Sequence, residues 1–263
     1  MPSVLAVPDA QSIIQDLLEI VEIRFSLEIA PERVEAFQKV IDAYACEHFG
    51  GLQALTTAIK RGQMCSSDWA QIIHLATNHE TQFFRHPPSL EAVVAACAAT
   101  GSPKVLSVGC STGEEAYSIA AVLLDAGHTA FEIVGLDVSA PCVETAQNGV
   151  YRKHHCISNL LATDVGHGLM QVRPEVRRMV RFAVHNILSD NPVPLRAPTV
   201  VITQNMLIYY KPETRHDILN RLAFELASGG HLIIGPAEDA GWDHPGLTRI
   251  VSSKSTVFVK GKP

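Results

Sequence analysis

Residues 104–118, with the sequence KVLSVGCSTGEEAYS, constrain the fold of this chain more than any other stretch. The apolar run 105–108 predicts a buried strand, and the small and apolar residues within 114–124 predict a helix. Gly109 and Gly113 surround the turn between them, where glycine lets a backbone come close to a ligand. A strand, a glycine turn and a helix in this order form the first unit of nucleotide-binding folds, although an ordinary tight turn gives the same pattern.

The turn favours one kind of adenosine-containing cofactor over another. The pattern G-x-G-x-x-G, which cradles the pyrophosphate of a dinucleotide, is absent. The carboxylate of Glu114 follows the turn directly, where it would repel a phosphate and accept a hydroxyl or ammonium group. The sequence therefore points to S-adenosylmethionine more than to NAD.

Composition excludes several classes of partner. The chain has 263 residues with 47% hydrophobic and 18% charged residues, enough for one large domain or for a small domain joined to a medium one. Its formal net charge is -6 and it has no long basic block, so we expect neither nucleic acid nor an anionic membrane as its main partner. No apolar run approaches the roughly 20 residues of a membrane span, and no signal peptide pattern opens the chain. We expect a cytoplasmic protein without membrane insertion.

Cysteine and histidine spacing predicts free thiols and no metal. The six cysteines form no C-x-x-C pair, which is typical of thiols in a reducing compartment. His154, His155 and Cys156 lie together, but no second pair of ligands has a suitable spacing for zinc.

Helical periodicity dominates the first part of the chain and predicts a helical N-terminal subdomain over residues 1–76. Apolar stripes mark helices over 11–25, 32–48, 52–59 and a fourth that begins near residue 66, where Ser66, Ser67 and Asp68 are expected to form its cap. Residues 77–103 are expected to form a linker and a helix, 90–99, that leads into the first strand.

Strands and helices alternate from residue 104 onward, which is the pattern of a parallel α/β sheet. Together with the linker, this part forms the second predicted domain, 77–263. The remaining strands are expected over 131–136, 180–184, 199–203 and 231–235, with a late hairpin over 247–259. We therefore predict a Rossmann-like sheet of the kind used by S-adenosylmethionine-dependent methyltransferases, with residues 150–180 as a possible reduced β subdomain.

Polar side chains follow the predicted strands at their carboxyl ends, where open parallel sheets bind ligands. Asp137 ends the second strand, 24 residues after Gly113, where a carboxylate can accept both ribose hydroxyls. Asn186 and Asn205 offer donor and acceptor edges to adenine or a carboxylate. The alternatives are a capping role for the aspartate and turn roles for the asparagines.

Arg85 and Tyr209 are candidate catalytic residues. Arg85 follows the aromatic pair 83–84, and its guanidinium could hold a carboxylate through two hydrogen bonds. Tyr209 lies beyond the fourth strand. A surface ion pair and a core aromatic are the respective alternatives.

Several motifs in order resemble the CheR-type chemotaxis receptor methyltransferases. Residues 80–85, ETQFFR, resemble the family signature N-E-T-x-F-F-R, and residues 111–118, STGEEAYS, resemble S-T-G-E-E-P-Y-S. Residues 148–152 and 186–188 follow in the family's order, and residues 204–210, QNMLIYY, match R-N-V-M-I-Y-F. The resemblance covers about residues 11–240.

The resemblance implies methyl transfer from S-adenosylmethionine to a glutamate on the cytoplasmic coiled coil of a chemoreceptor. It also implies a set of cofactor-lining residues, to which the strand-end pattern adds Gly109: His79, Thr81, Arg85, Gly109, Glu114, Asp137, Asn186, Ile187, Asn205 and Met206. Arg85 and Tyr209 are expected to flank the methyl group and the incoming glutamate. A glutamate is already ionised at neutral pH, with a pKa of roughly 4.3, so Arg85 is expected to position it rather than activate it.

The chain departs from the family at several positions. His79 stands in place of Asn, Ala116 in place of Pro, Gln204 in place of Arg, and residues 235–238 read GPAE in place of GHSE. Residues 150–180 look short for the family's β subdomain, which makes docking of a receptor's tether peptide by strand addition a weak expectation.

The predicted second helix is another departure, because it is acidic where family members often carry several arginines. Its charged residues are Arg33 and Lys39 against Glu32, Glu35, Asp42 and Glu47, so electrostatic docking to acidic receptor helices should be weak. We therefore expect a monomer with an unusual receptor partner, of the kind found in type IV pilus or gliding pathways. A methyltransferase for small-molecule carboxylates and a non-catalytic CheR-like scaffold are the alternatives.

Overall fold

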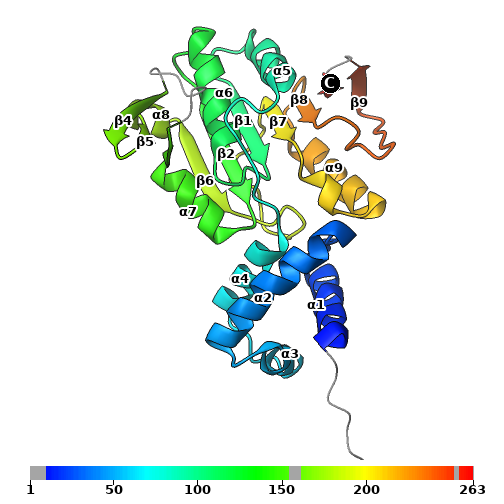
Figure 1. The fold of residues 1–263 in the computed structure, drawn as a ribbon. Coiled ribbons are helices and arrows are strands. Elements are labelled where there is room, and N and C mark those ends of the chain that lie inside the picture. The colour runs from blue at the N-terminus through cyan, green and yellow to red at the C-terminus, as the bar shows by residue number, and fades with distance from the viewer. Residues whose placement is uncertain (1–9, 154–160, 252–254, 263) are drawn as a thin grey trace, which may run out of the picture. The chain divides into compact units, whose positions relative to one another are not determined.

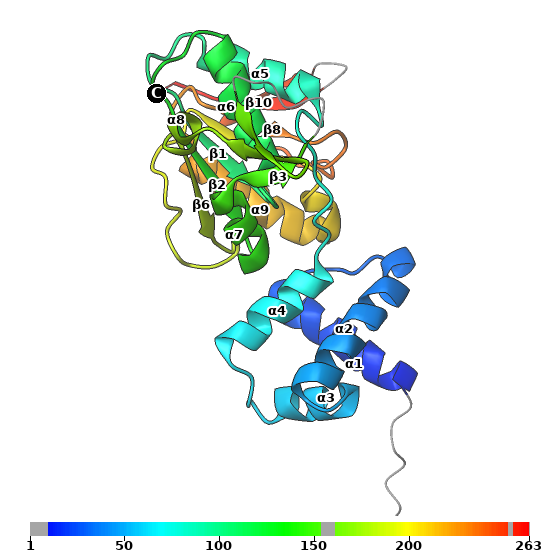
Figure 2. The same ribbon diagram turned by 60° about the vertical axis from the view of Figure 1, so that its left-hand side comes forward.

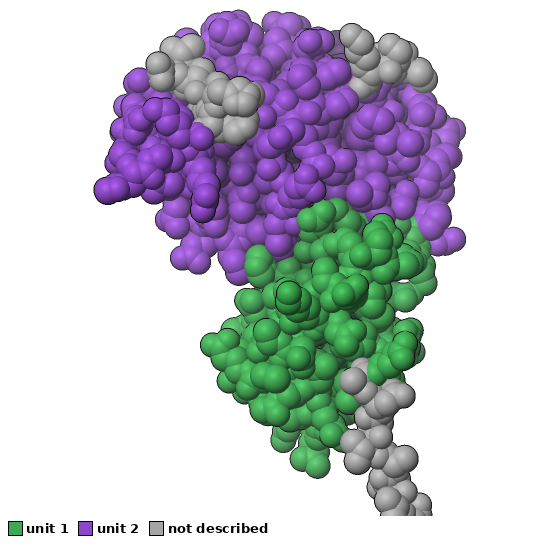
Figure 3. Space-filling view, viewed as in Figure 1, with its two compact units in different colours: residues 1–78, 209–211 green, residues 79–208, 212–263 purple. Residues whose placement is uncertain are grey.

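The computed structural model of this protein describes residues 10–153, 161–251 and 255–262. The chain forms two compact units (Figure 3). Unit 1 contains residues 1–78 and 209–211, and unit 2 contains residues 79–208 and 212–263. No helix within the described residues is long and apolar enough to cross a bilayer.

Unit 1 is helical (Figure 1). Its elements are α1 (Ala10–Phe25), the 3-10 helix η1 (Pro31–Arg33), α2 (Val34–His48), α3 (Leu52–Lys60) and α4 (Ser66–Ala76). Each α-helix turns an apolar stripe inward, and Leu17, Ile41, Leu55 and Ile72 are almost fully buried.

Two details of unit 1 differ from the sequence-based expectation. The predicted helix 32–48 is two elements, because Pro31 opens a short 3-10 turn before α2 begins. The fourth helix has Cys65 rather than the serines as its N-cap. Asp68 at the third helical position accepts the backbone N–H of Cys65 at 2.9 Å, which makes the return half of a capping box.

Unit 2 is built on a seven-stranded sheet with the order β6-β2-β1-β7-β8-β10-β9. Its strands are β1 (Lys104–Val108), β2 (Glu132–Asp137), β6 (Val180–Val184), β7 (Val200–Thr203), β8 (His231–Ile234), β9 (Leu247–Val251) and β10 (Thr256–Lys260). The first five run parallel, and β10 runs antiparallel between β8 and β9. This order confirms the predicted Rossmann-like methyltransferase fold with a late hairpin.

Helices cover both faces of this sheet (Figures 1 and 2). They are α5 (Pro87–Cys97), α6 (Glu114–Asp125) and α7 (Ala140–Asn148) on one face, and α9 (Pro212–Glu225) on the other. Val105, Ile133 and Ile202 join α5, α6 and α7 in one buried cluster. β1, β2, β7 and β8 are buried on both faces, which explains why they read as continuous apolar runs.

A second, three-stranded antiparallel sheet lies within residues 150–180, where the sequence predicted a possible reduced β subdomain. It has the order β3-β5-β4, with strands β3 (Val150–Arg152), β4 (Ala162–Gly166) and β5 (Leu169–Val172), and is followed by α8 (Pro174–Arg177). One further boundary differs: α5 begins at Pro87 rather than at Leu90. Both prolines of the pair 87–88 fit the first helical turn, where the backbone N–H needs no partner.

Candidate functional site

Four adjacent parallel strands bring the predicted polar residues to one rim of the sheet. Gly109, Asp137, Asn186 and Asn205 follow or end β1, β2, β6 and β7, which are neighbours in the order β6-β2-β1-β7. Because parallel strands end at the same edge, these residues share one rim, as expected for a ligand site of an open α/β sheet.

The Asp137 carboxylate is fixed by backbone donors. The N–H of Ser111 donates to Oδ2 at 2.8 Å and the N–H of Ser139 donates to Oδ1 at 2.9 Å. Burial raises the pKa of Asp137, while these hydrogen bonds and the nearby charge of His79 oppose the rise. Each oxygen keeps a further lone pair, so the group can accept two hydroxyl donors without moving.

Ser111 was not predicted as a site residue, but it ties three parts of the site together. Its backbone is left-handed, with φ 48°, which aims its N–H at Asp137. Its hydroxyl donates to the carbonyl of His79 at 3.0 Å. A left-handed backbone conformation is uncommon for a non-glycine residue. It occurs more often at functional sites, where the surrounding hydrogen bonds and packing stabilise it. Sequence patterns alone do not reveal this geometry.

The segment with the FFR motif is anchored to α6. Phe84 has a left-handed φ of 54°, and its N–H donates to the hydroxyl of Ser118 at 2.9 Å. The Phe83 ring meets the Tyr151 ring edge-on, with centroids 5.0 Å apart. Arg85 is exposed, and one of its Nη atoms donates to the carbonyl of Glu80 at 2.8 Å, which leaves further N–H groups for a ligand. Thr81 lies half-buried between these anchors.

Glu114 lies half-buried at the first position of α6. Burial raises its pKa, although a hydrogen bond from the Thr112 hydroxyl at 2.6 Å acts in the opposite direction. The hydroxyl of Tyr151 donates to the carbonyl of Thr112 at 2.7 Å and so braces the same turn. The small sheet that carries Tyr151 therefore supports the site from the side.

Gly109 adopts φ +76° and lies directly under Met206. A Cβ at this position would come within 2.8 Å of both Cβ and Cγ of Met206. Glycine is therefore needed here for two reasons. It tolerates the left-handed conformation, and its missing side chain leaves room for Met206 in the loop after β7.

Gly109→Ala is expected to lower the free energy of unfolding by about 3 kcal/mol, as the sum of backbone strain and overpacking. Urea denaturation measures the change. Gly127→Ala is the matched control, since its φ is +85° but nothing lies within 4 Å of the added Cβ, and it should cost about 1 kcal/mol. Equal losses in the two variants would show that the Met206 contact does not matter.

The loop after β7 is held by a buried carboxylate. Asn205 has a left-handed φ of 55°, and its N–H donates to Oε2 of Glu238 at 3.0 Å. Glu238 is 2% exposed, and burial raises its pKa. After β6, Asn186 accepts the N–H of Leu188 at 2.9 Å and Ile187 is buried. Glu238 therefore belongs to the site, although the sequence offered only its place in the GPAE motif.

Glu115 is a half-buried carboxylate that was not predicted. It accepts a hydrogen bond from the Ser107 hydroxyl at 2.7 Å. The pKa of Glu115 is raised to about 7, chiefly by burial and also by the charge of Glu238, while the hydrogen bond from Ser107 and the charge of Arg85 act in the opposite direction. Glu115 and Glu238 thus lie close enough to interact beneath the rim.

Stability should fall as the pH rises, in part through Glu115. An unfolded glutamate loses its proton near its ordinary value of 4.5, whereas folded Glu115 keeps it to about pH 7, so rising pH favours unfolding across that window. Glu115→Gln should therefore reduce the loss of unfolding free energy between pH 5 and pH 8 by about 2.5 kcal/mol, measured by urea denaturation. The exposed Glu144→Gln is the control. Identical pH profiles for both variants would contradict the expectation.

Tyr209 is the one predicted site residue in unit 1. Its carbonyl accepts the N–H of Glu28 at 2.9 Å, and the Arg33 guanidinium lies 6.0 Å from its ring centroid. The other ten predicted residues are in unit 2. The His154–Cys156 stretch lies outside the described residues.

The chain matches the family described as "CheR methyltransferase, SAM binding domain" over residues 79–257. It is 36% identical over 196 residues to the probable biofilm formation methyltransferase WspC of Pseudomonas aeruginosa, covering 68% of this chain and 46% of that protein. It is 33% identical over 193 residues to the chemotaxis protein methyltransferase of Escherichia coli, covering 66% and 65% respectively. The chain thus spans about half the length of the WspC relative.

Among solved structures, a TehB-like methyltransferase from Corynebacterium glutamicum is similar, with a TM-score of 0.41 and 15% identity over 74% of this chain and 95% of that one. Magnesium protoporphyrin IX methyltransferase from Synechocystis has a TM-score of 0.40 and 17% identity, covering 66% of this chain and 79% of the other.

Proposed function

Because the chain belongs to the CheR methyltransferase family, we propose that it transfers a methyl group from S-adenosylmethionine to glutamate side chains of a chemoreceptor-like coiled coil. S-adenosylmethionine is the cofactor of this family's domain. The observation that carries the proposal is the Asp137 carboxylate, fixed by Ser111 and Ser139 at the rim where four parallel strands end.

The residues at this rim fit the cofactor. Asp137 has free lone pairs for two ribose hydroxyls, and Asn186 and Asn205 offer amide edges for the base. Glu114 suits a cationic amino group and would repel a phosphate. The turn after β1 has no glycine-rich pyrophosphate cradle, which matches a cofactor without phosphates. We therefore assign binding to the ten unit 2 residues, with His79 contributing its backbone carbonyl through Ser111.

The proposed reaction needs little general acid or base catalysis from the protein. When bound, the cofactor supplies an activated sulfonium methyl group, and a glutamate acceptor is ionised at neutral pH. The protein then contributes mainly by holding the acceptor carboxylate in line with the methyl group and the sulfur atom of the cofactor. We assign this orientation to Arg85, whose guanidinium has donors left beside its bond to Glu80, and to Tyr209.

Residues 1–76 are proposed to recognise the receptor and residues 77–263 to transfer the methyl group. The exposed surface of α2 bears Glu35, Asp42 and Glu47 against Lys39, while Arg33 donates to the Thr77 carbonyl at 3.1 Å. An acidic surface disfavours docking to acidic receptor helices. We infer that a monomer acts on an unusual receptor, in a pilus, gliding or surface-attachment pathway; the biofilm-formation relative favours such a partner.

The test is transfer of radiolabelled methyl groups from S-adenosylmethionine to the purified cytoplasmic domain of a receptor encoded beside this protein. Label that base releases as methanol indicates a glutamate ester. Faster methylation of a motility receptor than of this neighbour would contradict the inferred partner. Label on a small carboxylic acid alone would favour the small-molecule alternative, and cofactor binding without any transfer would favour the non-catalytic scaffold.

A further inference from the structure

β6 is an edge of the large sheet, with β2 as its neighbour in the strand order. The N–H of Ile133 donates to the carbonyl of Met179, and the N–H of His185 donates to the carbonyl of Asp137. Residues 179 and 185 thus direct backbone groups toward β2. Because these groups alternate along a strand, those of Val180, Phe182 and Val184 point to the outside.

This edge is lightly protected. The side chain of Gln147 donates to the Phe182 carbonyl at 3.1 Å and so occupies one outward acceptor. β6 contains no proline, its one charged side chain, Arg181, is paired with Glu132, and Val184 is 54% exposed. Natural proteins usually block an exposed edge with proline, charged side chains or a bulge, because an open edge is a template for another strand.

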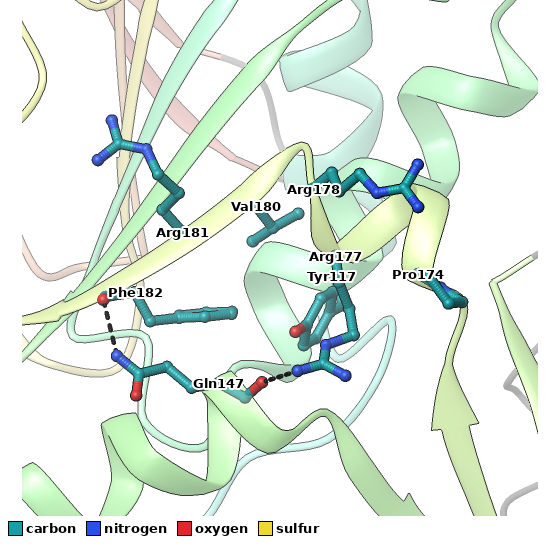
Figure 4. A pocket seen from close by; sticks show the side chains of 8 residues that line it. All are labelled: Tyr117, Gln147, Pro174, Arg177, Arg178, Val180, Arg181 and Phe182. Carbon is teal, nitrogen blue, oxygen red and sulfur yellow. Dashed lines mark hydrogen bonds between the residues drawn. The ribbon is translucent and has the colours of Figure 1, made fainter.

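A pocket of about 530 Å³ borders the same edge (Figure 4). It is lined by Tyr117, Gln147, Pro174, Arg177, Arg178, Val180, Arg181 and Phe182. The rings of Phe182 and Tyr117 lie on one side of β6, and Arg181 extends from the opposite side of the strand (Figure 4). Apolar side chains next to open backbone groups are the two requirements for binding an extended peptide.

The charge around the pocket selects the kind of peptide. Residues 173–181 contain Arg173, Arg177, Arg178 and Arg181 against Glu175, in a chain whose formal net charge is -6. Arg177 donates to the Gln147 carbonyl at 2.7 Å, and Arg181 pairs with Glu132. Arg178 is exposed and has no polar partner within the described part of the chain. Guanidinium groups placed in this way favour carboxylates.

We propose that β6 and this pocket bind an extended acidic peptide of a partner protein, which adds as a strand beside Val180–Val184. An apolar side chain of the peptide packs against Phe182, and its carboxylates meet Arg177 and Arg178. The pocket lies beside the amino-terminal half of β6, whereas the methyl-transfer rim lies at its carboxyl end. The proposal therefore concerns docking and stands apart from the proposed catalytic function.

Fluorescence anisotropy with the full chain tests the proposal. The probe is a fluorescein-labelled nonapeptide in which glutamate alternates with valine. One comparison peptide has lysine in place of glutamate, and another has proline in place of valine. We expect the glutamate–valine peptide to bind at least tenfold more tightly than either comparison peptide. The lysine peptide lacks the carboxylates, and the proline peptide lacks backbone N–H groups that would pair with β6.

Two variants separate the contributions of backbone and charge. Val184→Pro removes an outward N–H but no bond to β2, and should weaken binding at least tenfold. Arg178→Glu should weaken binding about tenfold, whereas Arg196→Glu, at another exposed arginine, should leave it unchanged. Unchanged binding of S-adenosylhomocysteine, measured by calorimetry, verifies that each variant is folded.

Three outcomes would overturn the proposal. They are absence of binding, equal affinity for the glutamate and lysine peptides, and full binding by Val184→Pro. ATP serves as a further probe. If ATP displaces the peptide, binds Val184→Pro normally and fails to bind Arg178→Glu, the pocket is a site for small anions and strand addition is wrong.

Discussion

Asp137→Ala is expected to weaken binding of S-adenosylmethionine and S-adenosylhomocysteine by about 100-fold. The proposed site uses both carboxylate oxygens, each with one lone pair committed to a backbone N–H and one left for a hydroxyl. Two hydrogen bonds to a charged acceptor contribute about 3 kcal/mol together, which corresponds to that factor. Titration calorimetry with S-adenosylhomocysteine measures the change without any need for a methyl acceptor.

Two further variants make the Asp137 result interpretable. Asp137→Asn keeps the shape but loses the charge, and should weaken binding by about tenfold. Asp125→Ala removes an exposed carboxylate at the other end of α6 and should leave binding unchanged. Circular dichroism checks the fold, because alanine also leaves the N–H groups of Ser111 and Ser139 without their acceptor. Near-normal binding by folded Asp137→Ala would remove this residue from the site.

The sequence predicted the elements whose pattern is set by burial. β1, β2 and β7 are covered on both faces, so each is a short apolar run between turn residues, and their positions were predicted to within a residue. The polar residue after each strand then followed from the rule for parallel sheets. This rule places Asp137, Asn186 and Asn205 at one rim from the sequence alone.

The features that sequence reasoning missed depend on long-range contacts. The sequence predicted a possible reduced β subdomain over 150–180 but not its individual strands, because β3 and β5 are only three and four residues long and β3 pairs with β5 rather than with the segment that follows it. The left-handed backbones of Ser111 and Asn205 follow from Asp137 and Glu238, which lie 26 and 33 residues further on. Glu115 was not predicted as a site residue, because only the fold reveals that Ser107 faces it.

Arg85→Ala is expected to reduce the rate of methyl transfer about 100-fold while changing the affinity for S-adenosylhomocysteine by less than fivefold. The guanidinium is proposed to orient the acceptor carboxylate, and misplacement of a reactant by about 1 Å can cost this much. The side chain is well placed for such a role, because the anchored backbone of Phe84 fixes its base and the bond from one Nη atom to the Glu80 carbonyl holds its guanidinium. Single-turnover transfer to a receptor domain that the wild type methylates measures the rate, and calorimetry measures the affinity.

The ratio between these two effects decides what Arg85 does. Arg85→Lys keeps the charge but loses the planar fork, so it should recover part of the rate if charge matters and little if two-point geometry matters. Arg196→Ala, in an exposed loop, controls for a general loss of positive charge. Equal losses of rate and affinity would mean that Arg85 acts through the cofactor alone, because losing a contact to the acceptor cannot alter cofactor binding that is measured without the acceptor. An unchanged rate would remove it from the chemistry and leave Tyr209 as the remaining candidate for orienting the glutamate.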